Sequence, residues 1–468
     1  MYDINIFRNE PEFIKKICSI WNSSTERRLM INAEAYYNGE NVTINDVKKE
    51  VVTRRGEGQY VARQNPYVSN FKIADNFVLD MIDQKVFTLL DRTPTIANID
   101  ERTVMLLKNK LDYALQNLAT EASLKGTAYA FVNANTTLDF NVFETENCIP
   151  FYDMQTNELK ALIRYFKVND VIDNVSKTFY EVYSNDGFMY LYEEYKDNFV
   201  LVNQVSFINR KIGNAYESKI INKQWNTGFP IIELKNNKNR RSDFNKSIRQ
   251  KIDSIDIVCS DFANNLADFQ DVFWIVKGMD DIEAEDFGDF IEEIKNTYKM
   301  TVGDGVDIDL KQIEIPYQAR DNFIKIMKDK LINDAGVVDT QLILSGGLTA
   351  TAIKVATTKL KNKVSKFEYE VYNTAYKMVL FAKEFVNDTS NNDDIEIKFF
   401  KNFINNDTEI INNLIASGYT LSQRTILENH PYVEDVDQEL ERIEEEGNKT
   451  SVVEPQEPPI VEEIEEEV

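Results

Sequence analysis

The sequence predicts a mixed α+β protein that is mainly helical and contains an antiparallel sheet. Two long stretches, beginning near Ser242 and Thr351, place apolar residues three or four positions apart, which is typical of amphipathic helices. A third stretch, residues 127–234, is rich in aromatic and β-branched side chains, which favour strands. Helices on either side of a strand-rich region indicate the α+β class.

The chain before residue 127 is predicted to be largely helical. Residues 13–20 space their apolar side chains as a helix does. Residues 71–90 repeat apolar positions mostly three or four apart and are soon followed by a proline, so a helix is expected there. Another helix is expected over residues 101–125, closed by Gly126 in the left-handed conformation that often ends helices.

The strand-rich region, residues 127–234, is predicted to form antiparallel sheet. Its runs of aromatic and β-branched residues are short and are separated by polar residues. The sequence SNDG at 184–187 lies between two such runs and indicates a hairpin turn. Neighbouring strands joined by tight turns pair in antiparallel fashion, which supports this interpretation.

A long helix is expected over residues 242–270, with Ser242 or Asp243 as its N-cap. At 1.5 Å per residue its length would be roughly 45 Å. Beyond it we expect a strand at 271–279, an acidic helix at about 283–299 and a strand at 306–315.

Two more helices and a glycine-containing connection are expected in the last third of the chain. One helix fits residues 318–335, and a second, more than about 50 Å long, fits residues 351–386. Two or more short helices fit residues 407–445. Residues 447–468 are proline-containing and acidic, so they are predicted to be disordered.

Composition excludes several classes of function. The single histidine, His430, removes most catalytic triads and histidine-rich metal sites. Three scattered cysteines make a disulfide framework and a four-ligand zinc site improbable, which fits folding in a reducing cytoplasm. The sequence has no run long enough for a transmembrane helix and no secretion signal at its start, so no membrane association is expected.

The net charge of −25 argues against a simple DNA-binding module, which would carry a basic surface. Residues 434–468 contain 15 acidic and 2 basic residues and therefore hold −13 of this charge. The rest of the chain is only mildly acidic. From composition and spacing alone, the chain is an acidic, elongated and oligomeric intracellular protein with no identifiable catalytic group.

The stretch LSGGLTATAIKVATTKLKNK, residues 344–363, has three possible interpretations. A nucleotide-binding P-loop requires a lysine directly after its last glycine, and here Lys354 lies seven residues past Gly347, so this interpretation fails. A flexible connection between two helices is the plainest alternative. The third is a loop near nucleic acid, in which Lys354, Lys359, Lys361 and Lys363 could reach phosphates.

Other motifs favour structural roles. The GDG at 303–305 lacks the rest of a calcium-binding loop and indicates a turn. The acidic residues at 280–286 are best explained as a solvated helix start rather than a metal cluster. The basic residues at 235–241 could contact phosphate, but a solvated loop is the default. Trp274, in an apolar strand, is a candidate for a subunit interface.

The order of sequence features resembles the portal proteins of tailed bacteriophages, in particular those of long-tailed phages of Gram-positive hosts. The resemblance covers about 400 residues. It rests on YYNG, NFVLDMIDQKVFTLLDRTP, LKGTAYAFV, IPFYD, GFPIIELKNN, KIDSIDIVCSDFANNLADFQDVFWIVKG and the closing NDTEIINNLIASGYTLSQRTILENHPYVEDVDQELERIEEE.

The resemblance implies a division of the chain into the regions of a portal subunit. In order, these are a wing with the N-terminal region, a stem helix, a clip, a second stem helix, a tunnel loop, a long wing helix, a crown and an acidic tail. Their implied ranges are 1–241, 242–270, 271–316, 317–336, 337–351, 352–387, 388–446 and 447–468.

The resemblance also implies which residues meet partners. The tunnel loop would face DNA, with Gly346 and Gly347 supplying backbone freedom. The stem would offer weak, salt-screened contacts if its lysines line the tunnel. The implied residues are Leu344, Ser345, Gly346, Gly347, Leu348, Thr349 and Lys354 in the loop, Lys325, Lys328 and Lys330 in the stem, and Trp274, Ile275, Val276 and Lys277 in the clip.

As a portal, the chain would be a structural protein without enzymatic activity or cofactor, forming a ring of about twelve copies at one vertex of the virion capsid after assembly in the host cytoplasm. Double-stranded DNA would pass through its channel without sequence-specific contact. The partners implied are the terminase large subunit, a head–tail adaptor, and the major capsid and scaffolding proteins. A ring charge of about −300 would keep DNA contacts weak.

Two other functions remain open at this point. A nucleotide-driven DNA translocase would require ATP hydrolysis, which the missing P-loop lysine disfavours. An adaptor or scaffold protein would act through its acidic tail, and deletion of residues 447–468 would then abolish its main activity, whereas a portal would still form rings.

Overall fold

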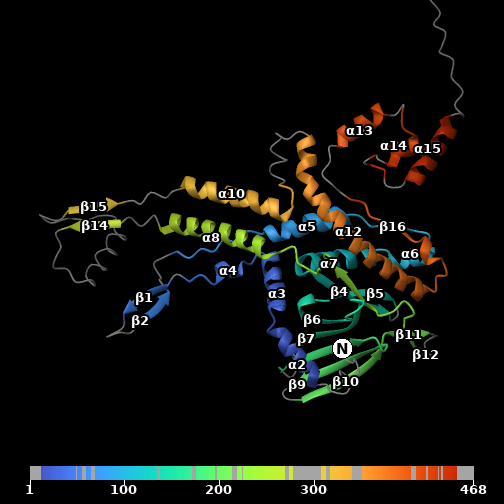
Figure 1. Cartoon of the computed structure of the whole chain (residues 1–468), viewed down its shortest axis with the longest axis horizontal. Coiled ribbons are helices and arrows are strands. Elements are labelled where there is room, and N and C mark those ends of the chain that lie inside the picture. Colours follow the sequence, from blue (N-terminus) through green and yellow to red (C-terminus); the bar gives the residue numbers. More distant parts are fainter. Residues whose placement is uncertain are drawn as a thin grey trace, which may run out of the picture. The chain divides into compact units, whose positions relative to one another are not determined.

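The computed structural model consists of two compact units. The first comprises residues 1–339 and 359–402, and the second comprises residues 340–358 and 403–468. Figure 1 shows the whole chain. The structure describes residues 12–48, 50–54, 60–64, 69–134, 137–170, 175–195, 198–212, 219–223, 225–268, 273–277, 307–311, 317–339, 350–401, 407–417, 420–428, 430, 432–433 and 436–450.

The helices follow the predicted order. Two short 3₁₀ helices, η1 (Thr145–Asn147) and η2 (Asn392–Asp394), accompany them. The α-helices are α2 (Glu12–Asn22), α3 (Thr25–Tyr37), α4 (Val42–Asn45), α5 (Phe77–Leu90), α6 (Glu101–Leu107), α7 (Lys110–Lys125), α8 (Lys246–Asp268), α10 (Tyr317–Ala335), α12 (Ala350–Val386), α13 (Asp407–Ala416), α14 (Gln423–Glu428) and α15 (Val436–Thr450).

The strands pair almost entirely in antiparallel fashion, as predicted. They are β1 (Glu50–Arg54), β2 (Tyr60–Gln64), β3 (Thr95–Ala97), β4 (Thr127–Ala134), β5 (Leu138–Val142), β6 (Cys148–Tyr152), β7 (Leu159–Asp170), β8 (Val175–Ser184), β9 (Phe188–Tyr195), β10 (Asn198–Ser206), β11 (Ile208–Ile212), β12 (Lys219–Lys223), β13 (Ile231–Lys235), β14 (Phe273–Lys277), β15 (Asp307–Lys311) and β16 (Glu396–Lys398).

The region 127–234 forms two sheets rather than one. The first has the strand order β10-β9-β8-β7-β6, and the predicted SNDG turn joins β8 to β9 with Gly187 at φ 95°. Helix α2 packs on this sheet, where Ile14 and Cys18 join a cluster of tyrosines and aliphatic residues from β6 to β9. The second has the order β12-β11-β4-β13, with β5 on β4 and one parallel contact between Ile208 and Ala134.

The predicted helix over residues 101–125 is in fact two helices. Helix α6 ends at Leu107, and Asn109 has a φ of 64°, which breaks the helical path before α7 begins. Gly126 closes α7 with a φ of 97°, as predicted. The apolar pattern continues across Asn109, so its period could not reveal the break.

The helix predicted over residues 71–90 begins later than expected. Helix α5 starts at Phe77, and residues 69–76, which we call the strap, have no regular secondary structure. Ile73 lies at helical spacing from Phe77, but its backbone is bonded to α8 instead. A tertiary contact therefore overrides the local pattern.

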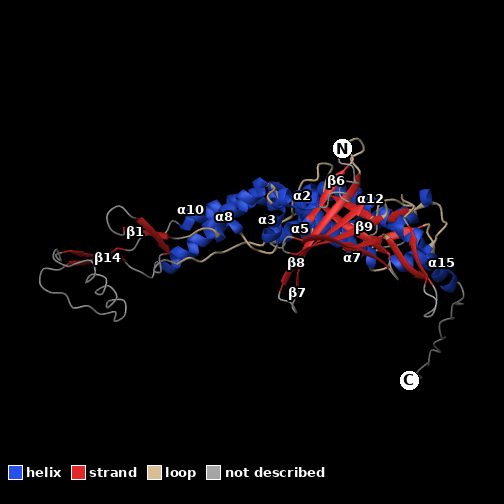
Figure 2. Cartoon of the chain, turned by 90° about the horizontal axis from the view of Figure 1, so that it is seen from below, coloured by secondary structure: helices blue, strands red, loops and turns tan. Residues whose placement is uncertain are grey.

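Helix α8 also begins later than predicted, at Lys246, and neither Ser242 nor Asp243 is its N-cap. Asn245 takes that role, because its Oδ1 accepts the backbone N–H groups of Ser247 and Ile248 at 2.9 and 3.2 Å. The helix has 23 residues and is therefore about 34 Å long. It lies beside α10, as Figures 1 and 2 both show.

Helices α10 and α12 agree with the prediction within a residue or two, and three helices, α13–α15, occupy the region where short helices were expected. The expected disorder from residue 447 is wrong at its start, because α15 continues to Thr450. Residues 451–468 lie outside the described residues. Within the described part of the chain, no helix is long and apolar enough to cross a membrane.

The predicted strands at 271–279 and 306–315 are β14 and β15, which pair with each other. The acidic helix expected at 283–299, the acidic residues at 280–286 and the GDG turn at 303–305 lie outside the described residues.

Candidate functional site

The segment predicted to approach DNA is described only at its two ends. Residues 340–349, which include Leu344–Thr349, lie outside the described residues, as does the side chain of Lys354. The described chain stops at Asp339 after α10 and resumes at Ala350, where α12 begins. The site that can be built is therefore the pair of anchors from which this segment extends.

The first anchor is the end of α10. Gly336 has a φ of 68°, and its N–H and that of Val337 both donate to the carbonyl of Ile332 at 3.0 and 3.4 Å. Val338 is buried and is held from both sides by Gln84 of α5, which donates to its carbonyl at 3.1 Å and accepts its N–H at 2.9 Å. The chain therefore leaves α10 in a fixed position.

The second anchor is α12, whose lysines bond to the end of α10. Lys359 Nζ donates to the carbonyl and side-chain oxygens of Asn333 at 3.3 and 3.1 Å. Lys363 Nζ donates to the carbonyl of Ala335 at 3.2 Å. Carbonyl groups at a helix C-terminus carry partial negative charge and lack helical partners, so lysines there are stabilising. The two anchors are thus held against each other.

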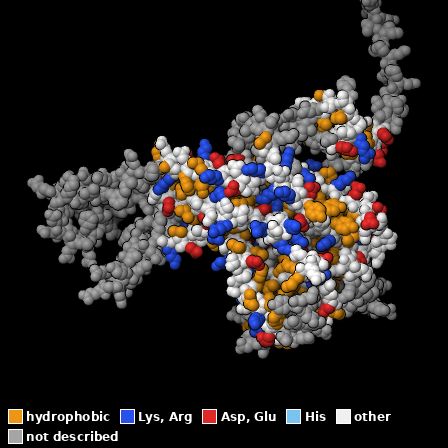
Figure 3. Space-filling view, viewed as in Figure 1, with side chains coloured by type: hydrophobic (Ala, Val, Ile, Leu, Met, Phe, Trp, Pro, Cys, Tyr) orange, Lys and Arg blue, Asp and Glu red, His pale blue; other side chains and the backbone are white. Residues whose placement is uncertain are grey.

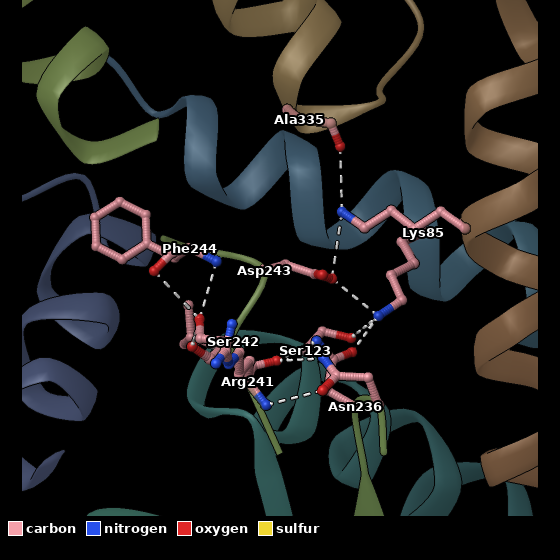
Figure 4. A network of polar contacts seen from close by, with 11 residues as sticks. Lys85, Ser123, Asn236, Arg241, Ser242, Asp243, Phe244 and Ala335 are labelled. Atoms are coloured by element: carbon pink, nitrogen blue, oxygen red, sulfur yellow. Dashed lines mark hydrogen bonds and ion pairs between the residues drawn. The ribbon is translucent and has the colours of Figure 1, made fainter. Parts of the chain in front are cut away.

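Asp243, in the connection before α8, joins these anchors to the sheets. Its carboxylate lies 3.3 Å from Lys363 Nζ and 2.9 Å from Lys85 Nζ. Lys85, on α5, also donates to Ser123 Oγ of α7 at 2.9 Å and to Asn236 Oδ1 after β13 (Figure 4). We call Lys85, Asp243, Lys363, Ser123 and Asn236 the junction, because they link α5, α7, α12, the end of β13 and the start of α8.

The junction is charged and largely buried. The side chain of Lys85 is 2% exposed, and its Nζ lies 3.7 Å from the centre of the Phe367 ring. Burial lowers the pKa of Lys85 to about 8, against the attraction of Asp243. Burial alone would raise the pKa of Asp243, but Lys85 and Lys363 together hold it below its usual value. At neutral pH the carboxylate therefore carries its charge between two ammonium groups.

The local backbone explains how Asp243 reaches this position. The N–H of Asp243 donates to the carbonyl of Ser123 at 2.9 Å, which places the connection directly on the end of α7. Gly126 permits this close approach, because a Cβ there would lie 2.4 Å from the carbonyl oxygen of Arg240. The prediction of Asp243 as a helix cap identified an important polar residue but assigned it the wrong partner.

The strap is held on α8 by a row of polar side chains. Asn264, Ser260 and Asp256 are four residues apart and so lie on one face of the helix. They accept the backbone N–H groups of alternate strap residues, Phe71, Ile73 and Asp75, at 2.5, 2.9 and 3.2 Å. This site was not predicted from the sequence, although the polar residues at 256, 260 and 264, four positions apart, indicate it.

Asp256 differs from Asp243 in its partners. Within the described part of the chain, its carboxylate accepts the amide of Asn41 at 2.7 Å and the N–H of Asp75. Burial raises the pKa of Asp256 to about 6. This carboxyl group therefore titrates close to neutral pH.

The three stem lysines, Lys325, Lys328 and Lys330, are exposed on α10, whereas Leu331 is buried. Lys and Arg side chains are prominent over α8 and α10 on the face seen in Figure 3. That these lysines line a channel stays a prediction. So does partner contact by the clip residues Trp274–Lys277, which form β14 and pair with β15.

The basic loop after β13 is less solvated than expected. The guanidinium of Arg240 bonds Glu233 at 2.6 Å and lies 4.0 Å from the centre of the Tyr152 ring. Arg241 is exposed. Arg240 therefore fastens the loop to the sheet, and phosphate contact by its neighbours stays a prediction.

The remaining chemistry of the described residues is sparse. Cys18, Cys148 and Cys259 are free thiols, and burial raises the pKa of the Cys18 thiol to about 12. Among the residues that the structure describes, no group of three or more His, Cys, Asp or Glu side chains could hold a metal ion.

Comparison with known proteins identifies the family. The sequence profile described as "Phage portal protein, SPP1 Gp6-like" matches residues 19–452. The match spans most of the chain, including both sheets, the junction and helices α8, α10 and α12. The chain therefore belongs to the SPP1 Gp6-like family of phage portal proteins, as the resemblance implied.

Two curated portal proteins are similar along most of their length. The portal protein of Clostridium phage phiCD119 is 26% identical over 451 residues, which cover 91% of this chain and 94% of that protein. The portal protein of Bacillus phage SPP1 is 25% identical over 384 residues, which cover 79% of this chain and 74% of that protein. These similarities support a portal function and do not favour the translocase or adaptor alternatives.

Solved structures give a weaker likeness. A chain in the neck of a native gene transfer agent particle, computed with C12 symmetry, has a TM-score of 0.37 at 10% identity and covers 74% of this chain and 86% of that one. A chain of the native gene transfer agent virion has a TM-score of 0.33 at 10% identity, covering 74% and 97%. Likenesses this weak support no conclusion about the function of the chain.

Proposed function

We propose that the chain is a non-enzymatic portal subunit, about twelve of which form a ring around a channel for double-stranded DNA. The single observation that carries the proposal is membership of the portal family over residues 19–452. In this proposal the ring occupies one vertex of the virion capsid, and the regions implied by the resemblance, from wing to crown, are regions of its subunit.

The junction supports a specific role for the segment 340–349. Lys359 and Lys363 hold its two anchors together, which would give the segment a firm base, and glycines such as Gly346 and Gly347 are the residues expected where a backbone must move. A loop that must yield to moving DNA requires both properties. We therefore propose that residues 340–349, the part of the predicted tunnel loop 337–351 between the two anchors, meet the DNA.

Weak electrostatic contact is expected along the channel. Lys325, Lys328 and Lys330 are exposed on α10, and the chain as a whole carries −25. Phosphate contacts are non-specific and salt-screened, and their weakness would let DNA slide. The terminase large subunit, the head–tail adaptor, and the major capsid and scaffolding proteins are the proposed partners, with the terminase and adaptor meeting the clip around Trp274–Lys277.

Ring assembly is the first test. Negative-stain images of the purified full chain, averaged by rotational symmetry, should show a closed ring with a central hole. A stable monomer at micromolar concentration, with and without scaffolding protein, would contradict the proposal. ATP hydrolysis by the pure protein would instead revive the translocase alternative.

The lysine braces provide a second test. The Lys359→Met portal variant should still form rings. Capsids assembled with it should package DNA more slowly, because one anchor of the tunnel loop loses its bonds to Asn333. Lys366→Met is the matched control, since Lys366 is an exposed lysine of the same helix. Equal packaging rates for the two variants would count against the role given to the anchors.

A further inference from the structure

A concave pocket of about 970 Å³ lies in the first unit, apart from the junction. Helix α3, strand β6 and the start of α8 all contribute to its lining, and we call it the α3 pocket. Figure 1 shows α3 leading from α2 toward the start of α8, where the ring centres of Tyr36 and Phe244 are 4.9 Å apart. A pocket of this volume has room for several large side chains.

The lining of the α3 pocket is mostly apolar. Leu29 and Met30 line it from α3, Ile149 from β6 and Phe244 from the connection before α8. Leu29 is 56% exposed. Apolar side chains in a concavity release water when a second apolar surface covers them, which favours binding. An occupant with large apolar side chains therefore suits this lining.

The walls of the pocket are fixed by bonds to the rest of the unit. Where α2 ends, Trp21 Nε1 donates to the carbonyl of Glu146 at 2.8 Å. The ammonium group of Lys125 lies 2.7 Å from the carboxylate of the same Glu146. On the side of the connection before α8, Ser242 Oγ donates to the carbonyl of Leu124 at 2.5 Å. A preformed site of this kind lowers the entropy lost when an occupant binds.

The charge of the lining is opposite to that of the chain. The chain has 78 acidic and 53 basic residues, yet the charged residues that line the pocket in the described structure are five basic and one acidic. Three of the basic residues, Lys125, Arg240 and Arg249, lie 2.7, 2.6 and 3.7 Å from carboxylates of the same chain. The other two, Arg241 and Lys246, are exposed. An occupant with carboxylates beside its apolar side chains would match them.

A segment of protein fits these properties better than DNA does. A duplex carries its phosphates on the outside and stacks its bases within, so it has no large apolar groups to place in a concavity. A short peptide can present apolar and acidic side chains together, and recognition of such segments in preformed grooves is common.

We infer that the α3 pocket binds a short acidic segment of a second protein, whose apolar side chains cover Leu29 and Met30 and whose carboxylates pair with Arg241 and Lys246. Binding at this pocket goes beyond the proposed portal function and does not require a ring. A neighbouring copy of this chain and the phosphates of DNA are the two other possible occupants.

Peptide binding by the purified full chain tests the chemistry of the occupant. The probe is a fluorescein-labelled synthetic peptide in which pairs of glutamates alternate with pairs of leucines, and fluorescence anisotropy reports its binding. It should bind about tenfold or more tightly than two control peptides, one with lysine in place of glutamate and one with serine in place of leucine. Equal affinity for the serine peptide, or no binding of the probe up to about 1 mM protein, would overturn the inference.

A variant of α3 tests the apolar contact. Leu29→Gln should weaken binding of the probe by about tenfold, because an apolar side chain of the pocket is lost. Ile31→Gln is the matched control, since Ile31 is an exposed residue of the same helix and is not among the lining residues. It should change the affinity by less than about twofold. Equal effects of the two substitutions, with both variants folded by circular dichroism, would contradict the assignment.

A charge reversal tests the electrostatic contact. The double variant Arg241→Glu and Lys246→Glu should weaken binding of the probe by about tenfold or more. Glutamate is favoured in the first turn of a helix, so the substitution at the start of α8 should not impair folding. Lys238→Glu is the control, because Lys238 is exposed in the same connection and does not line the pocket. If Lys238→Glu weakened binding as much, general surface charge would explain the result and the inference would fail.

Ring assembly and DNA binding identify the other occupants. Leu29→Gln and the double variant should assemble as the unaltered chain does in negative-stain images. If both lost assembly while Ile31→Gln and Lys238→Glu kept it, the pocket would belong to a neighbouring copy, which overturns the inference. Displacement of the probe by a DNA duplex whose affinity Leu29→Gln leaves unchanged would assign the pocket to phosphates and also overturn it. Probe binding by a chain that forms no rings would contradict the proposed function alone.

Discussion

Two aspartates, one just before α8 and one within it, are both largely buried, yet their surroundings give them opposite electrostatic behaviour. Asp243 lies between Lys85 and Lys363, which hold its pKa below the usual value. Asp256, thirteen residues later, has an amide and a backbone N–H as its partners, and burial raises its pKa to about 6. One carboxylate keeps its charge at neutral pH, whereas the other gains or loses it close to that pH.

The difference shows what each region can do. A buried carboxylate between two lysines forms a strong link at neutral pH, and removal of one member leaves buried charge unpaired. The junction is therefore suited to hold the anchors of the segment 340–349 at neutral pH. A carboxylate held by neutral donors, such as Asp256, forms a weaker link, and the strength of that link depends on pH. The contact between the strap and α8 is therefore expected to respond to pH.

The largest effect is expected at the junction. Asp243→Ala leaves Lys85 and Lys363 without their shared anion and should lower the free energy of unfolding by about 3–5 kcal/mol, measured by denaturant titration at fixed protein concentration. Lys366→Ala, an exposed lysine on α12, should change it by less than about 0.5 kcal/mol. If both variants changed the free energy of unfolding by the same small amount, the junction would contribute little to stability.

A second change tests the backbone that positions Asp243. Gly126→Ala places a Cβ 2.4 Å from the carbonyl oxygen of Arg240 at a φ of 97°, and it should destabilise the protein by about 2–3 kcal/mol. Gly228→Ala is the matched control. Gly228 also has a positive φ, 124°, but nothing lies within 4 Å of its Cβ position, so only the backbone strain remains. If the two variants were equally stable, steric contact at Gly126 would not matter.

The strap should be held less strongly than the junction. Asn264→Ala removes two hydrogen bonds to the backbone of Phe71 and should cost about 1–2 kcal/mol. Amide exchange in residues 69–76 should accelerate, whereas exchange in α5 should not. Gln250→Ala, at an exposed position on the same helix, is the control. Acceleration throughout α5 and the strap together would mean that the strap is no separate unit.

The smallest effect is a pH dependence that belongs to Asp256. Burial raises the pKa of the Asp256 carboxyl group in the folded state, so protonation of this group stabilises the fold. Its contribution to the free energy of unfolding is full below about pH 4 and is lost as pH rises through about 6. Asp256→Asn should flatten the stability profile between those values, and the strap amides should show the change first. The pH dependence due to Asp243 has the opposite sign, because its contribution to the free energy of unfolding is lost as pH falls through its lowered pKa. A steeper profile in Asp256→Asn would contradict this assignment.

Much of the fold could be predicted because its elements are long and regular. The helices α10 and α12 and the hairpin joining β8 to β9 follow directly from apolar spacing and turn residues. The errors lie where tertiary contacts override local pattern. Residues 71–76 have helical spacing but bond to α8, and the helix predicted at 101–125 breaks at Asn109.

The candidate site was predictable only in part. The glycines indicated residues 337–351 as the connection between two helices, and α10 and α12 do flank this segment, whereas its contact with DNA stays a prediction. The partners of Lys359 and Lys363 could not be predicted, because Asn333, Ala335 and Asp243 are brought to them by packing of separate helices. Pairing of a buried lysine with an aspartate 158 residues away has no local signal.

A side-chain-resolution reconstruction of the assembled ring tests the central claim most directly. We predict that Lys359 and Lys363 contact the end of α10 in every subunit, with the segment 340–349 directed from these anchors toward the axial channel. Anchors that are separated in the ring, or a segment that points away from the axis, would contradict it.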